Sequence, residues 1–225
     1  MSEQDAIKWK TFWSTMSDPM HSSSEEAYYD VYAKELRALI GDQKFATVVE
    51  IGAGTGTFYE RLGFDRVNYT GYDYSSSMVD KFKADFPAAD ISVAAFSEVK
   101  CTQNVDLVFS NGVIQYISLD ELRDHLRHFR ARLTPSGRII HASVPWRSLR
   151  KSYLLRTMFA DVTKRSIRQR LVSQLALLNL RSDGIGRWYD MPEVRNVAER
   201  EGYDVKLFGS LNYPYRCHFS FKLRS

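Results

Sequence analysis

The chain of 225 residues has only two cysteines, Cys101 and Cys217, and neither lies in a CxxC pair or in a Cys/His cluster at metal-ligand spacing. We therefore expect neither a disulfide scaffold nor a metal site. No stretch approaches eighteen consecutive apolar residues, and the first ten residues, MSEQDAIKWK, place polar side chains where a signal peptide has its apolar segment. These absences predict a soluble cytoplasmic protein without a transmembrane segment.

The chain also lacks a strong excess of either charge, because its 31 lysines and arginines and 27 acidic residues give a net charge of only +4. The basic residues gather in one place. Between positions 147 and 187, ten lysines and arginines stand against Asp161 and Asp183, a local net charge of +8. Such a segment favours an anionic partner. Its amphipathic pattern fits a solvated helical face equally well. The same charge could also contact a membrane surface or RNA.

Short apolar runs alternate with helical patterns along most of the chain, which predicts one α/β domain built on a parallel, doubly wound sheet. We expect an N-terminal helical cap over residues 1–40 and a basic helical lid insertion over 147–187. Two final strands joined by a turn are expected to form an antiparallel hairpin. The expected strands cover 45–51, 66–73, 90–96, 105–114, 134–145, 203–210 and 216–224, and the expected helices cover 6–40, 57–62, 75–86, 119–133 and 191–202.

A glycine loop follows the first expected strand and contains Gly52, Gly54 and Gly56. Glycine lets the backbone approach a ligand closely and offer free N–H groups. A dinucleotide-binding loop needs its third glycine at position 57, where this chain has Thr57. Asp73 ends the next strand and is placed to accept both hydroxyls of a ribose. The pattern predicts a ligand that has a ribose and no pyrophosphate.

Three segments in order resemble the signature segments of class I S-adenosylmethionine-dependent methyltransferases: VVEIGAGTG at 48–56, YTGYD at 69–73 and DLVFSNGVIQYI at 106–117. The resemblance covers about residues 45–145 and, with the final hairpin, nearly the whole sheet. It implies a Rossmann-like sheet of seven strands, mainly parallel with an antiparallel last strand. It also implies S-adenosyl-L-methionine as cofactor and S-adenosyl-L-homocysteine as product.

The resemblance also implies roles for single residues. The loop and the methionine half of the cofactor would be held by Glu50, Gly52, Ala53, Gly54, Gly56, Asn111, Gly112 and Val113. Asp73 would bind the ribose hydroxyls, and Tyr74 and Met78 would lie beside the adenine ring. One departure stands after the third strand, where the family often has an acid for the adenine amine. This chain has Ala94, Ala95 and Phe96 there, so backbone groups, Phe96 and Ser97 are expected at the adenine.

Several acceptor classes lack their residues in this chain. There is no Asn/Asp-Pro-Pro-aromatic segment after the fourth strand for base amines, no cysteine nucleophile after proline, and no acidic cluster for a catechol-binding metal. The remaining class is a hydroxyl, amine or carboxylate of a small molecule. His141 is the candidate general base and Tyr116 a candidate contact to substrate or cofactor. We expect His125 and His128 on the solvated face of their helix.

Aromatic and basic residues of the N-terminal cap and of the lid segment form the expected acceptor site. They suit a phosphorylated or carboxylated acceptor such as a nucleotide-linked sugar. An RNA-modifying methyltransferase is less favoured because no RNA-binding module is appended, and a catalytically silent binding protein is the other alternative. The acceptor molecule, the acceptor atom and the oligomeric state stay open. The expected acceptor residues are Trp9, Trp13, Tyr28, Tyr29, Trp146, Arg187, Trp188 and Tyr189.

Overall fold

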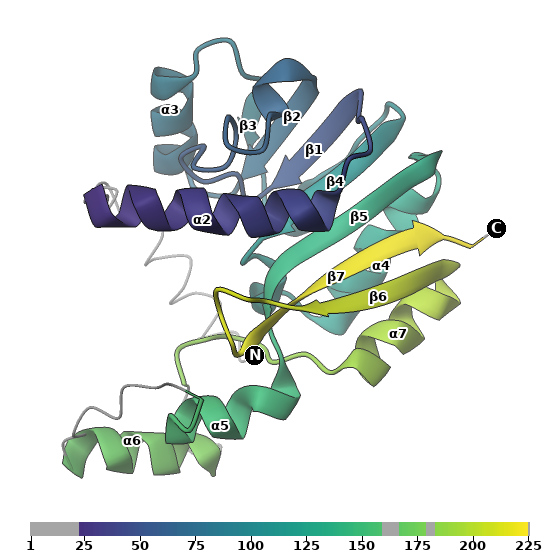
Figure 1. Ribbon diagram of the computed structural model, residues 1–225. Helices are drawn as coiled ribbons and strands as arrows, with labels where there is room; N and C mark the ends of the chain where they lie inside the picture. Colours follow the sequence, from purple (N-terminus) through teal and green to yellow (C-terminus); the bar gives the residue numbers. More distant parts are fainter. Residues whose placement is uncertain (1–22, 159–166, 179–182, 225) are drawn as a thin grey trace.

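The computed structural model describes residues 23–158, 167–178 and 183–224. Within them, seven strands form one sheet in the order β3-β2-β1-β4-β5-β7-β6 (Figure 1). Trp9 and Trp13, expected near the acceptor, lie outside the described residues. The strands are β1 (Thr47–Ile51), β2 (Asn68–Asp73), β3 (Ile91–Val93), β4 (Val105–Asn111), β5 (Leu133–Pro145), β6 (Tyr203–Gly209) and β7 (Arg216–Leu223).

The five strands β1 to β5 pair in parallel, and the last two pair antiparallel. β1 lies between β2 and β4, so the chain reverses direction across the sheet there. Ligands of doubly wound sheets bind outside the carboxyl ends of the strands at this switch point. β7 runs between β5 and β6 as the second strand of a hairpin. The expected mixed, mainly parallel sheet with an antiparallel end is confirmed.

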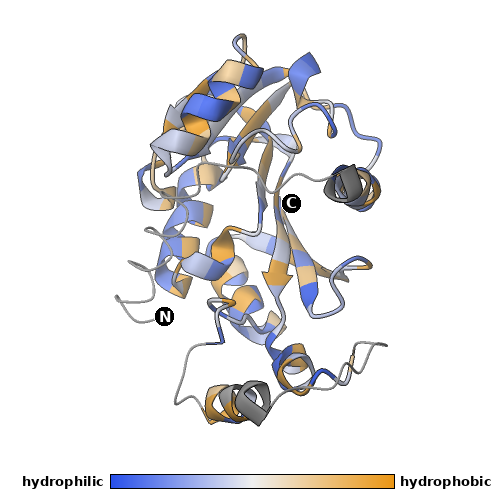
Figure 2. Ribbon diagram, turned by 90° about the vertical axis from the view of Figure 1, so that its left-hand side faces the viewer, coloured by the Kyte–Doolittle hydropathy of each residue, from blue (hydrophilic) through white to orange (hydrophobic). Residues whose placement is uncertain are grey.

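Helices cover both faces of the sheet and bury its apolar residues in two separate layers. Figure 2 shows apolar residues concentrated on the strands, with mixed apolar and hydrophilic residues on the helices beside them. One layer packs α2 (Ser23–Ile40) and α3 (Ser76–Asp85) on the sheet, and the other packs α4 (Leu119–Arg130) and α7 (Met191–Arg200). In α2, Tyr32, Leu36 and Ile40 are buried at four-residue spacing, as an amphipathic helix requires.

Polar caps set where two of these helices begin. Ser75 precedes α3, and its hydroxyl accepts from the backbone N–H of Met78. Ser118 and Glu121 exchange hydrogen bonds as the expected capping box of α4. α4 ends at Arg130, three residues earlier than expected, because β5 already begins at Leu133.

The expected helix over 57–62 is wrong. This segment forms a series of turns that ends at Gly63, and the 3-10 helix Phe64–Arg66 follows. Gly63 has a φ of 76°, a left-handed conformation that stops a helix. Only six residues separate Gly56 from Gly63, and a segment this short makes few of the repeating hydrogen bonds that stabilise a helix. The glycine loop is therefore followed by turns and not by the N-terminus of a regular helix.

The basic segment after β5 contains the 3-10 helix Arg147–Leu149, α5 (Arg150–Leu155) and α6 (Ile167–Leu177). In Figure 1 the two α-helices lie beyond the carboxyl end of β5 and beside each other, away from the faces of the sheet. A guanidinium N–H of Arg150 donates to the carbonyl of Ala176 at 2.8 Å, which ties α5 to α6. The expected helical character holds for the described part of the segment, and its role as a lid stays a prediction.

Candidate active site

The glycine loop lies at the carboxyl end of β1 and takes a conformation that side chains disfavour. The φ angles of Gly52, Gly54 and Gly56 are 76°, 57° and 85°. A Cβ on Gly52 would lie 2.2 Å from Cγ2 of Val113, so the loop touches the segment after β4. A Cβ on Gly54 would meet no atom within 4 Å. The loop is thus packed at Gly52 and open at Gly54.

Asp73, the last residue of β2, holds this loop through its carboxylate. One oxygen accepts from the N–H of Gly54 and the other from the N–H of Ser75, both at 2.9 Å. Burial raises the pKa of Asp73, and these backbone N–H groups oppose that effect. The oxygen that binds Ser75 thereby caps the turn that follows β2. The backbone N–H of Tyr74 also hydrogen-bonds to this carboxylate, which has about four acceptor sites and can still accept from a ligand hydroxyl.

Glu50 in β1 is buried and stands two residues before Gly52 of the loop. Its carboxylate accepts a hydrogen bond from the hydroxyl of Tyr69 at 2.7 Å. Burial, with a smaller repulsion from Asp73, raises the pKa of Glu50 to about 7, against the lowering effect of Tyr69. A carboxyl group poised at neutral pH would ionise fully if a cation came to lie beside it.

The segment after β4 supplies a second open position at the same edge of the sheet. Gly112 has a φ of 69°, and a Cβ there would meet no atom within 4 Å. Its N–H donates to the carbonyl of Ala142 in β5 at 2.9 Å. The side-chain oxygen of Asn111 accepts from the hydroxyl of Tyr32 at 2.9 Å. Tyr32 thereby brings α2 to the edge where Gly54 and Gly112 are open.

The residues expected around the adenine come from three segments: Tyr74 directly after Asp73, Met78 in α3, and Phe96 after β3. The pKa of Tyr74 is raised by burial and by the neighbouring Asp73 and Tyr116, so Tyr74 and Tyr116 lie close together. Met78 lies partly buried in the first turn of α3. The ring centre of Phe96 lies 4.6 Å from that of His125, with the two rings tilted.

The backbone after β3 closes a small turn where an acid was missing from the family pattern. The N–H of Ala95 donates to the carboxylate of Glu98 at 2.9 Å, and the N–H of Ala94 donates to the carbonyl of Asp73 at the same distance. Glu98 is an exposed acid bound to its own turn. The adenine contacts of Ala95 and Phe96 stay predictions.

His141 does not reach this edge of the sheet. It is 0% exposed in the middle of β5, and its Nδ1 lies 2.7 Å from the hydroxyl oxygen of Ser110. Burial lowers its pKa to about 3, so the ring is neutral and shielded from any acceptor. The structure gives no support to His141 as a general base.

The expectation for His125 is wrong, because its ring is buried against Phe96, Phe129 and His141. His125 stands three residues after Leu122 and four before Phe129, so it shares their face of α4. His128 is partly exposed, and its Nε2 accepts from the N–H of Cys101 at 3.0 Å.

Of the expected acceptor residues after β5, two are structural. Tyr189 is 0% exposed, and its hydroxyl donates to the carbonyls of Ile114 and Ile117, both at 2.8 Å. Trp188 is buried, and its ring N–H donates to the carboxylate of Asp183 at 2.8 Å. Burial removes both side chains from direct contact with an acceptor.

Trp146 and Arg187, the other two residues of this group, are only partly buried. Trp146 is partly buried, and its backbone N–H donates to the carbonyl of Tyr215. The guanidinium of Arg187 lies 5.3 Å from the ring centre of Tyr189. Contacts of Trp146 and Arg187 with the acceptor stay predictions.

Two of the arginines in the described part of 147–187 form ion pairs within the protein. Arg147 pairs with Asp190 at 3.1 Å and with Glu193 at 2.9 Å. Arg150 pairs at 2.9 Å with the Asp183 carboxylate that also binds Trp188. These two arginines fasten the segment to α7 and to itself, so its sequence charge overstates what it presents to a partner.

On the other side of the edge, Tyr28 and Tyr29 lie in α2 as expected. The ring of Tyr28 contacts those of Tyr32 and Tyr213, and the ring of Tyr29 contacts that of Phe58. Sequence reasoning missed Tyr32 itself, together with a group at the start of the last strand and beside it: Gln115, Ser143, Tyr213, Tyr215 and Arg216. The available signal was the YPYR sequence at 213–216, a cation among aromatic residues at a turn.

Comparison with known proteins agrees with this geometry. Residues 49–139 match a family model described as a methyltransferase domain. An uncharacterized methyltransferase of Alkaliphilus oremlandii is 23% identical over 142 residues, which cover 60% of this chain and 66% of that protein, just under two thirds of its length. The chain has a class I methyltransferase fold.

Solved structures of methyltransferases share this fold at low sequence identity. DesVI of Streptomyces venezuelae superposes with a TM-score of 0.60 at 14% identity, over 100% of this chain and 99% of its own. CalS10, an amino pentose methyltransferase of Micromonospora echinaspora solved with S-adenosylmethionine, has a TM-score of 0.62 at 12% identity, over 91% and 98%. No helix in the described ranges is long and apolar enough to cross a membrane.

Proposed function

We propose that this protein is an S-adenosylmethionine-dependent methyltransferase that methylates a hydroxyl, amine or carboxylate of a small, anionic acceptor. The observation that carries the proposal is the loop at Gly54, whose N–H is bound by Asp73 and whose Cβ position faces open space. Gly112 presents a second open position. It is the neighbour of Val113, whose side chain contacts the loop at Gly52. Two open glycines beside a buried carboxylate suit a ligand with a ribose next to a small charged chain.

Each part of the cofactor has residues that would hold it. Asp73 would take the ribose hydroxyls on its remaining lone pairs, and Tyr74 and Met78 would flank the adenine. Glu50 would face the methionine ammonium, which its raised pKa favours because a nearby cation restores the ionised form. When bound, S-adenosylmethionine supplies a methyl group on a sulfonium centre that is already reactive.

The chain's own contribution to the reaction is positioning. Asn111 is held beside Gly112 by the hydroxyl of the buried Tyr32, and its side chain would orient the acceptor at the methionine end. Holding the acceptor in line with the methyl group supplies much of the rate without a base. The buried, neutral His141 has no part in it, which favours an acceptor that is an amine or that ionises readily.

The small-molecule acceptor is supported over RNA by the paired arginines of the basic segment. Arg147 and Arg150 are bound to carboxylates within the protein, and phosphate contacts need cations that are available. CalS10, an amino pentose methyltransferase, acts on a small molecule of the same broad class.

Calorimetric titration of the purified protein with S-adenosylmethionine and, separately, with NAD tests the cofactor. Micromolar binding of S-adenosylmethionine alone is the expected result, and binding of NAD alone or of neither overturns the proposal. The acceptor class is tested next by measuring S-adenosylhomocysteine released with phosphorylated or carboxylated hydroxy and amino compounds and with their neutral analogues. Turnover restricted to the neutral analogues, or to RNA, contradicts the anionic acceptor.

A further inference from the structure

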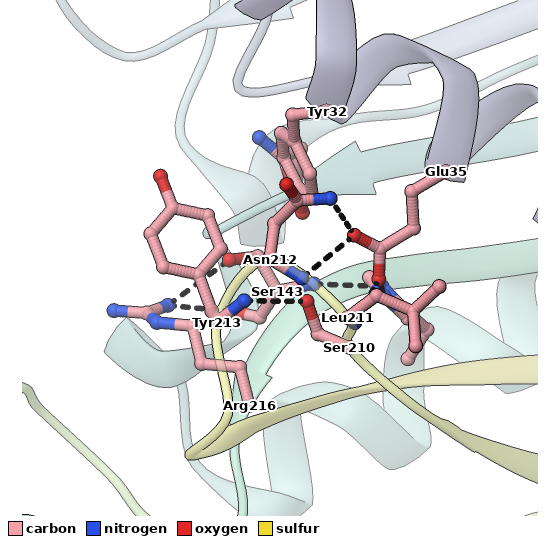
Figure 3. A network of polar contacts seen from close by, with 10 residues as sticks. Tyr32, Glu35, Ser143, Ser210, Leu211, Asn212, Tyr213 and Arg216 are labelled. Carbon is pink, nitrogen blue, oxygen red and sulfur yellow. Dashed lines mark hydrogen bonds and ion pairs between the residues drawn. The ribbon is translucent and has the colours of Figure 1, made fainter. Parts of the chain in front are cut away.

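Arg216 stands where the final hairpin meets the candidate active site. It begins β7 and pairs in register with Pro145, the last residue of β5, so it lies at the carboxyl end of the parallel strands. One terminal nitrogen of its guanidinium donates to the carbonyl of Ser143 at 2.6 Å and to the side-chain oxygen of Gln115 at 2.8 Å. Figure 3 shows this side chain beside Ser143 and the ring of Tyr213, with Tyr32 above them.

The positive charge of Arg216 has no carboxylate partner within 4 Å among the described residues, unlike the charges of Arg61, Arg147 and Arg150. The nearby Glu35 is already occupied by the N–H groups of Leu211 and Asn212 and by His218. The hydrogen bonds that Arg216 donates to Gln115 and Ser143 all come from the same terminal nitrogen. The other terminal nitrogen and Nε are left to bind a ligand as a fork.

Aromatic rings surround this guanidinium. Its central carbon lies 5.8 Å from the ring centre of Tyr213 and 5.2 Å from that of Tyr215. The ring of Tyr213 contacts the ring of Tyr32 at 5.3 Å, and the hydroxyl of Tyr32 donates to Asn111. A continuous path of contacts therefore joins Arg216 to the methionine end of the proposed cofactor site.

The backbone that fixes Arg216 is strained. Ser143 has a φ of 58°, a left-handed conformation that non-glycine residues rarely adopt, and it lies in an irregular stretch of the β5–β7 pairing. This turn aims the carbonyl of Ser143 at Arg216. Strain of this kind persists where surrounding contacts enforce it and concentrates at functional sites.

We propose that Arg216 binds a carboxylate or phosphate group of the methyl acceptor, and that the partly exposed ring of Tyr213 contacts the body of the same molecule. The inference rests on the proposed function, and it assigns the binding of the acceptor's negative charge to one residue outside the basic segment 147–187. A planar, bidentate guanidinium selects these two groups over neutral ones.

The test uses three probes of similar size: 4-hydroxybenzoate, phenyl phosphate and the neutral 4-hydroxybenzamide. Each is titrated calorimetrically into the full chain, with and without saturating S-adenosylhomocysteine. We expect at least one anionic probe to bind at least tenfold more tightly than the amide, and the preferred anion distinguishes carboxylate from phosphate. Equal binding of the amide and both anions overturns the proposal.

Arg216→Gln is expected to reduce the affinity for the preferred anion at least tenfold. Arg66→Gln, which removes the same charge from a highly exposed side chain, is expected to leave that affinity unchanged. Retention of anion affinity in Arg216→Gln overturns the proposal. S-adenosylhomocysteine binding to the wild-type chain is measured in parallel, so that its failure counts against the proposed function and not against Arg216.

A measurement on the wild-type chain covers the case in which Arg216→Gln does not fold. Phenylglyoxal modifies accessible arginines, and the modified sites are identified by mass spectrometry. The preferred anion is expected to slow modification of Arg216 and not of Arg66. Equal rates at Arg216 with and without the anion would show that the guanidinium does not hold it.

Discussion

The carboxylate of Glu35 lies 2.9 Å from Nε2 of His218, which joins α2 to the last strand across the molecule. Nδ1 of His218 accepts from the backbone N–H of Ser143, so the ring proton is on Nε2 and points at Glu35. The same carboxylate accepts from the N–H groups of Leu211 and Asn212 in the hairpin turn. Glu35 therefore holds together the three elements that surround the candidate acceptor site.

Glu35→Ala is expected to lower the free energy of unfolding by roughly 1–3 kcal/mol at pH 7, because it removes hydrogen bonds to a charged group. Burial raises the pKa of Glu35, but its hydrogen bonds with Asn212, His218 and Leu211 outweigh burial and lower it. The stabilisation is thus present above the unfolded pKa of 4.5 and lost as the pH falls through the lower folded value. Urea unfolding at pH 7 and pH 3 measures it.

Glu60→Ala, an exposed acid on the turns after the glycine loop, is the control and should leave unfolding unchanged. A loss of stability for Glu35→Ala that is as large at pH 3 as at pH 7 would show that the carboxylate charge is not what holds the hairpin.

Asp73→Ala is expected to weaken S-adenosylmethionine binding by roughly 1.5–3 kcal/mol, about 10- to 150-fold, because charge-assisted hydrogen bonds to the ribose are lost. The change also frees the N–H groups of Gly54 and Ser75, which loosens the loop. Calorimetric titration measures the affinity, and Asp85→Ala, an exposed acid at the end of α3, is the control of equal charge. Unchanged affinity in Asp73→Ala would remove Asp73 from the site.

The sheet and the glycine loop could be predicted from the sequence because their signals are local. Alternating apolar runs indicate the strands, and the loop, Asp73 and the Ser118 capping box are each encoded within a few residues. The missing helix after Gly56 is a failure of the same local reasoning, since Gly63 is a visible stop.

The position of Arg216 could not be predicted in this way, because its partners Gln115 and Ser143 are 101 and 73 residues away along the chain. Charge counting pointed to residues 147–187, where Arg147 and Arg150 are bound internally. Arg216 reaches the candidate site because β7 pairs with β5, which the local sequence does not specify.

Glu50→Gln separates stability from binding. With a folded pKa of about 7 and an ordinary value of 4.5, the native state holds a proton that the unfolded state releases, so stability is present below pH 4.5 and is lost as the pH rises through 7. Glutamine removes this loss, and the free energy of unfolding should rise by roughly 3 kcal/mol at pH 8 and much less at pH 5. Glutamine can still accept from Tyr69.

The same variant should bind S-adenosylmethionine about tenfold more weakly, because the expected partner of its ammonium group is gone. Urea unfolding at both pH values and calorimetric titration give the two readouts. Stronger binding by Glu50→Gln, or an equal gain in stability at pH 5 and pH 8, would contradict the role of Glu50 as a buried carboxyl group that ionises beside the ammonium group of the cofactor.

The neighbouring buried rings of His125 and His141 are expected to make the protein sensitive to acid. Burial lowers both pKa values, that of His141 to about 3, and the charge of His141 lowers that of His125 further. In the unfolded chain both histidines bind protons near their ordinary value of 6.5. Stability is therefore fully present above pH 6.5 and falls as the pH drops from 6.5 towards 3, by up to about 1.4 kcal/mol per pH unit for each ring.

His125→Phe removes one of these rings from the titration and keeps a flat side chain against Phe96 and Phe129. We expect its advantage over the wild-type protein to grow by roughly 2 kcal/mol between pH 7.5 and pH 5, measured by urea unfolding at both values. Comparison of one variant with itself at two pH values cancels any constant packing effect of the larger ring. A difference that stays constant with pH would mean that His125 takes up its proton in the folded state, and so that solvent reaches the layer between α4 and the sheet.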